Sequence, residues 1–155
     1  MADAATISVT ATMLPDEIAK TISGSMTVTP TDANDKWYYK LTALTTTSAQ
    51  LIAGSFLNYT AIAPATGHTA ITTSDKVRFL FVQNQSSGDG LYLCFDGQTA
   101  VNTGVDMAFV GASETWFAQL QNTTVGNLTA ISSDIDGTGD ATVNVLVIAL
   151  LDDVA

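Results

Sequence analysis

The chain has 155 residues, of which 46% are hydrophobic and 13% charged, and its formal net charge at pH 7 is −10. This length suits one domain whose core needs no metal or disulfide, and the hydrophobic content argues against intrinsic disorder. All five basic residues lie between Lys20 and Arg78, so the second half of the chain has no positive side chain. Binding to nucleic acid or to an anionic membrane is therefore not expected, since both need clustered Lys and Arg.

The first thirty residues have their own pattern. Residues 7–13 (ISVTATM) alternate apolar and hydroxyl side chains, which predicts a strand. Pro15 and the two acids after it resemble a helix start, but residues 16–22 allow barely two turns before a Ser-Gly pair, so a short helix or an irregular arm is expected. We therefore expect residues 1–30 to form an N-terminal arm or first strands beside a domain of residues 31–155.

The N-terminal segment lacks a basic region followed by a continuous apolar run, so a signal peptide is not expected. No apolar run reaches the roughly 18 residues of a membrane-spanning helix. These two observations lead us to expect synthesis and folding in a cytoplasm.

Residues 35–41 predict another strand with a clear pattern, with Trp37 and Tyr39 on one face and Tyr38 and Lys40 on the other. This alternation is typical of a half-buried strand. Two weaker runs follow at residues 50–52 and 56–63, before a Gly-, Thr- and Ser-containing loop over residues 64–75.

The strongest pattern lies at the centre of the chain. Residues 78–83 (RFLFVQ) and 91–95 (LYLCF) are apolar runs separated by the turn-forming residues 84–90, which predicts a β-hairpin. Residues 79–82 are apolar on both faces, so we expect this strand in the middle of a sheet.

The remaining strands are expected at residues 106–110, 114–120, 125–132 and 141–151. The last of them is apolar on both faces apart from Asn144, as in a central strand or a subunit interface. Ten or so short strands with almost no helical periodicity predict an all-β protein, a jelly-roll-like antiparallel β-sandwich with an N-terminal arm.

The lone cysteine and the lone histidine are both interpreted as structural. Cys94 stands between Leu93 and Phe95, so we expect a buried small apolar side chain rather than a nucleophile. His68, between Gly67 and Thr69, is expected to be exposed in its loop, because it has no acidic or Ser neighbour at a useful spacing.

The acidic loop at residues 134–140 resembles the start of a calcium-binding loop. Asp134, Asp136 and Asp140 supply carboxylates, but Gly137 comes too early, no closing Glu follows, and strands flank the loop. An Asp/Gly turn is the better interpretation, and a structural calcium ion is the alternative.

No motif predicts catalysis. The chain has no Gly-x-Ser-x-Gly elbow, phosphate loop or His/Cys cluster. Most acids lie in expected turns or near the ends, where contact with water denies them the environment that a catalytic acid or base needs. Among them are Asp89, Asp96, Asp106, Asp134, Asp152 and Asp153. We therefore expect a protein that is not an enzyme, and assign no catalytic, cofactor-binding or metal-binding residue.

Several segments carry a resemblance to a known class. They are residues 22–40, 76–84 (KVRFLFVQN), 91–97 (LYLCFDG), 111–117 and 142–147 (TVNVLV). With them the chain resembles a virion structural protein of a tailed bacteriophage, of the capsid cement or head-decoration type carried by phages of aquatic bacteria, cyanobacteria included. The resemblance implies a non-enzymatic protein, commonly a homotrimer, that binds the major capsid protein on the outer shell of the virion and locks neighbouring capsomers together.

That role leads to one hypothesis and leaves two alternatives. Residues 1–30 would make intersubunit contacts, for instance by adding a strand to a neighbour's sheet. The first alternative is a receptor- or carbohydrate-binding β-sandwich of a tail or fibre, for which Trp37, Tyr38 and Trp116 are the candidate aromatic platform. The second is a tail-tube or connector subunit.

Overall fold

The computed structural model describes residues 4–13, 20–31, 35–54, 71–101, 107–134, 142–152 and 154. The expected strand at residues 56–63, His68 and residues 135–140 of the acidic loop lie outside the described residues. The chain divides into two compact units, Met1–Ala33 and Asn34–Ala155.

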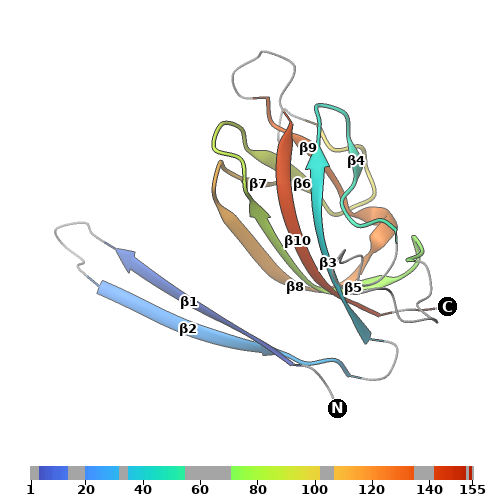
Figure 1. The fold of residues 1–155 in the computed structure, drawn as a ribbon. Helices are drawn as coiled ribbons and strands as arrows, with labels where there is room; N and C mark the ends of the chain where they lie inside the picture. Colours follow the sequence, from blue (N-terminus) through green and yellow to red (C-terminus); the bar gives the residue numbers. More distant parts are fainter. Residues whose placement is uncertain are drawn as a thin grey trace. The chain divides into compact units, whose positions relative to one another are not determined.

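The first unit is a two-stranded antiparallel hairpin (Figure 1). Strand β1 (Ala5–Met13) pairs with β2 (Lys20–Val28) in an unbroken register from Ala5↔Val28 to Met13↔Lys20. This confirms the first strand. The short helix or irregular arm expected over residues 16–22 is wrong for Lys20 to Ile22, which belong to β2, because the alternation that runs to Val28 suits a strand. Residues 14–19 lie outside the described part.

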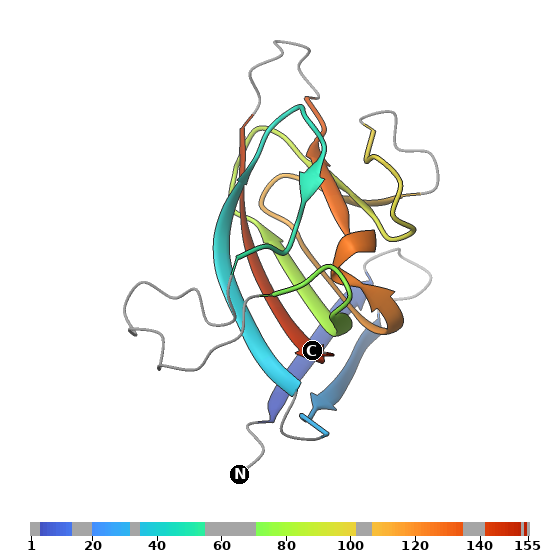
Figure 2. The ribbon, with the colours of Figure 1, turned by 90° about the vertical axis from the view of Figure 1, so that its right-hand side faces the viewer.

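The second unit is an antiparallel β-sandwich. Its elements are β3 (Asp35–Leu44), β4 (Ala49–Gln50), β5 (Lys76–Asn84), β6 (Leu91–Cys94), β7 (Ala108–Val110), β8 (Thr115–Thr124), the 3-10 turn η1 (Val125–Asn127), β9 (Thr129–Ser132) and β10 (Val143–Asp152). They build a large sheet in the order β3-β10-β5-β8 and a small sheet in the order β4-β9-β6-β7 (Figures 1 and 2).

The core lies between the two sheets. Tyr38, Val82 and Val147 of the large sheet share one buried cluster with Leu93 and Ala130 of the small sheet. In strands, every second side chain points to the same face, so the positions of these residues identify the inner face of each sheet. The expected all-β sandwich is therefore confirmed.

Strand pairing is nested along the sequence. The first sandwich strand pairs with the last, β3 with β10, and the successive pairs β4 with β9, β5 with β8 and β6 with β7 lie inside it. Strand β10 also pairs with β5, and β9 with β6, which joins these ladders into the two sheets.

The expected central hairpin is wrong in its pairing. Strand β5 does lie inside a sheet, between β10 and β8, but β6 belongs to the opposite sheet, so the polar loop between them crosses the sandwich. Asn84 holds this loop, because its buried Nδ2 donates to the carbonyl oxygens of Asp89 (2.7 Å) and Gly111 (3.0 Å). Gly90 ends it where no larger residue fits, since an added Cβ would lie 2.5 Å from the ring of Phe109.

Two further segments differ from expectation. Residues 125–127 form the 3-10 turn η1 rather than the start of a strand, because the N–H groups of Val125 and Gly126 donate to the carbonyls of Asp75 and Thr73 in another loop. The strand expected at residues 50–52 ends at Gln50, and the next two residues bury their side chains in the core.

Candidate interaction surface

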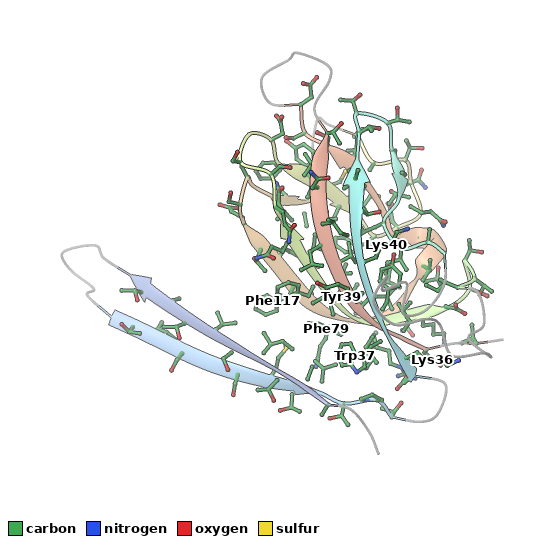
Figure 3. All side chains as sticks on the ribbon, in the orientation of Figure 1. Lys36, Trp37, Tyr39, Lys40, Phe79 and Phe117 are labelled. Atoms are coloured by element: carbon green, nitrogen blue, oxygen red, sulfur yellow. The ribbon has the colours of Figure 1, made fainter. Side chains whose placement is uncertain are left out.

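The large sheet has an apolar outer face, directed away from the core. The strand register places nine large apolar side chains on it. They are Trp37, Tyr39 and Leu41 of β3, Leu146, Ile148 and Leu150 of β10, Phe79 and Phe81 of β5, and Phe117 of β8. We call this set the outer apolar face; Figure 3 labels four of its aromatic residues.

The middle of the outer apolar face is open. Leu41 is 56% exposed and Tyr39 39% exposed, and Phe81 and Ile148 are partly exposed. A cluster of exposed large apolar side chains on one sheet face is unusual for a monomeric protein and is typical of an interaction site. The same face therefore offers the best candidate site among the described residues.

One end of this face is tied by charge. Asp35 of β3 lies directly opposite Asp152 of β10, and two carboxylates at such a position repel each other. Arg78 of β5 pairs with both: its Nε donates to Oδ1 of Asp35 at 2.9 Å, and its Nη2 donates to Oδ2 of Asp152 at 2.8 Å. These three residues join the ends of β3, β5 and β10, and Lys76 of β5 is paired with Asp152 at the same end; the other register positions of this face that the structure describes carry no charged side chain.

The three aromatic candidates for a sugar platform do not lie together. Tyr38 is fully buried, and Trp116 packs against the core with its ring centre 5.3 Å from that of Phe95. Only Trp37 lies on the outer apolar face, where its ring meets Phe79 edge-on at 6.4 Å. A platform built from all three is therefore excluded.

Burial also changes the chemistry of Tyr38. Its hydroxyl donates to the carbonyl oxygen of Ala53 at 3.4 Å. Loss of water around the phenol raises the pKa of Tyr38 from 10.0 to about 12, because burial disfavours the charged form more than this hydrogen bond favours it. The residue acts as a structural anchor between β3 and the segment after β4.

The β1–β2 hairpin has two chemically distinct faces. Because directly paired residues share a face, the register groups apolar side chains on one side: Ala5, Ile7, Val9, Ala11, Ile22, Met26 and Val28, with Gly24 among them. The other side carries hydroxyl groups alone: Thr6, Ser8, Thr10, Thr12, Thr21, Ser23, Ser25 and Thr27. We call these the apolar and hydroxyl faces of the hairpin.

Cys94 is buried, as expected, in a second small cluster with Ala100 and Ile131 on the outer side of the small sheet. Its thiol donates to Oδ1 of Asp96 at 2.9 Å. That bond, with a further one from the backbone N–H of Gln98, lowers the pKa of Asp96 below its usual value. The thiol thus has a local structural role at the end of β6.

The structure brings no acidic cluster together in the part it describes. Of the acidic loop, only Asp134 is described, at a positive φ of 44° that suits a turn. Within the described ranges, no three His, Cys, Asp or Glu side chains are placed to hold a metal ion. In the same ranges, no helix is long and apolar enough to cross a membrane.

The outer apolar face was not predicted as a surface, although part of its signal was visible in the sequence. Residues 79–82 and the last strand are apolar on both faces, which predicted strands whose two faces are both buried. Phe117 carried no such signal, because its role follows only from its pairing with Phe81 across β5 and β8. No protein-family model, curated protein or solved structure matches this chain.

Proposed function

We propose that this chain is a non-enzymatic structural protein of a tailed-phage virion, a cement or decoration protein that binds the outer capsid shell and stabilises contacts between capsomers. Its partners would be the major capsid protein and further copies of itself, as a homotrimer. The resemblance over most of the chain supports the class. The outer apolar face is the observation that carries the proposal, because a binding role needs a broad surface that is poor in charge at its centre.

The sandwich itself supports the same class. We propose that it is of jelly-roll type, because eight strands form two four-stranded antiparallel sheets and their pairs are nested from β3 with β10 to β6 with β7. Such a fold gives a rigid body, and many copies on one lattice would add their modest single contacts into strong attachment.

Co-sedimentation tests the proposal. Purified protein is mixed with empty capsids of the phage that encodes it, pelleted, and compared with protein spun alone. We expect a fixed number of copies per capsid in the pellet and a higher temperature of capsid disruption, measured by calorimetry. Protein that stays in the supernatant and leaves capsid stability unchanged would contradict the proposal and direct attention to the tail.

A variant pair assigns the binding surface. Leu41→Glu places a charge on the outer apolar face, and Thr47→Glu places the same charge at an exposed position outside the strands. The first variant should lose capsid binding if attachment depends on the outer apolar face, either through contact with the shell or through contact with further copies, and the second should bind as the parent does.

A further inference from the structure

The β1–β2 hairpin has an apolar face that it cannot bury by itself. Two strands form a single layer, so the side chains of Ile7, Val9 and Ile22 have no opposite sheet within the hairpin. An isolated two-stranded hairpin is marginally stable in water, and an apolar face needs a second layer. The regular nine-residue pairing therefore indicates that another surface completes this unit.

The outer apolar face has the chemistry and size to be that surface. Both faces are apolar along most of their length: Lys20, paired with Met13, belongs to the last pair of the hairpin register, and the charged side chains on the outer side of the large sheet lie at one end of it. Nine paired residues span about 30 Å at ~3.3 Å per residue, and ten-residue strands such as β3 and β10 span about 33 Å. Two strands would thus cover part of the width of a four-stranded face along nearly its full length.

Electrostatics limits where two copies can meet. Each copy carries a net charge of −10, so contacts between copies through charged surfaces are repulsive. Two faces that are apolar at their centres avoid this repulsion there and release water when they join.

The connector favours exchange between copies. Residues 29–31 (Thr-Pro-Thr) follow β2 without a turn. Pro30 fixes its own φ and restricts Thr29 to extended conformations, so this part of the connector resists a tight reversal. An element with an uncovered face that is joined to its domain through a proline-restricted segment can be exchanged between identical chains.

We propose that the apolar face of the β1–β2 hairpin of one copy packs on the outer apolar face of a second copy, so that each sandwich receives a hairpin from a neighbour in a closed oligomer. The hydroxyl face of the hairpin then forms the outer surface of the assembly. This inference deepens the self-association proposed above, and it specifies face-to-face packing rather than the addition of a strand to a sheet edge.

Cross-linking between distinguishable chains tests the inference directly. In a Cys94→Ala background, one chain carries Val9→Cys and another, with a mass tag, carries Leu41→Cys; the two are co-expressed and treated with a bis-maleimide of about 10 Å reach. We expect a covalent dimer of the two chains. A control with Thr10→Cys, on the hydroxyl face, should give much less product. A product that forms only when both cysteines are in the same chain would overturn the inference.

Mass in solution provides a second test. The full chain should be an oligomer, and Val9→Lys or Leu41→Lys should shift it to a single chain of 16.2 kDa. Thr10→Lys adds the same charge one residue away and should leave the oligomer intact. An unmodified chain of 16.2 kDa, or an oligomer that survives both Val9→Lys and Leu41→Lys, would contradict the inference.

The failure of this inference can be distinguished from that of the proposed function. If the chain co-sediments with capsids but gives no interchain cross-link, the proposed function stands and the exchange of hairpins between copies is refuted. If the chain gives the interchain cross-link but stays in the supernatant, the exchange of hairpins stands and the capsid role is refuted.

Discussion

The amide of Asn84 allows a quantitative test of how the two sheets are joined. It donates to two backbone carbonyls, and its Oδ1 accepts a hydrogen bond from the N–H of Ser86 at 2.9 Å. Asn84→Ala removes a hydrogen bond from each of three backbone groups, of which the Gly111 carbonyl keeps another from the N–H of Glu114 (3.2 Å), and each such loss costs about 1 kcal/mol. We expect the free energy of unfolding to fall by about 3 kcal/mol, which corresponds to roughly 10 °C in Tm for a chain of this size.

Urea denaturation followed by tryptophan fluorescence measures this loss. Asn144→Ala is the matched control, because Asn144 is exposed on β10, and its replacement should change stability by less than about 0.5 kcal/mol. Asn84→Asp keeps the size of the side chain, but an ionised carboxylate cannot donate to two carbonyls, so it should cost at least as much as alanine. A loss below about 1 kcal/mol in Asn84→Ala would refute the role of this amide as the tie between the sheets.

Three further predictions concern ionisable groups. Arg78→Met should lower the free energy of unfolding by about 2 kcal/mol in urea denaturation, because the buried carboxylate of Asp35 loses a charged partner that is itself partly exposed; an unchanged midpoint would contradict this. In an alkaline absorbance titration, Tyr38 should ionise last, with a pKa of about 12, and Tyr38→Phe should remove that step. Because folding raises this pKa, the stability that it contributes is complete below pH 10.0 and is lost as the pH rises through about 12. Cys94→Ala should raise the pKa of Asp96 in an NMR titration, because the thiol is the main cause of its lowering; an unchanged value would show that the thiol has no such effect.

The strands were predictable from local patterns. Alternation identified residues 7–13 and 35–41, and apolarity on both faces placed residues 79–82 inside a sheet, as β5 shows. These patterns involve only side chains within one strand, so they can be recognised in the sequence without knowing which strands pair.

The pairing of strands was not predictable in the same way. The turn-forming residues 84–90 suit a hairpin and a crossing loop equally, and the choice depends on Asn84 reaching Gly111, 27 residues further along the chain. The outer apolar face is likewise a product of pairing, since Phe117 joins it only through β5. Such long-range partners leave no local pattern.

Nested pairing has a consequence for the order of folding during synthesis. Strand β10 is made after every other strand of the sandwich, yet it lies between β3 and β5 and is hydrogen-bonded to both. The large sheet therefore cannot form completely before residues 143–152 have been synthesised. About a hundred residues separate the end of β3 from the start of β10, with which it pairs. Contacts at such sequence separation fold slowly and leave apolar strands exposed in the meantime. Any chain that stops short of β10 would lack the centre of its large sheet.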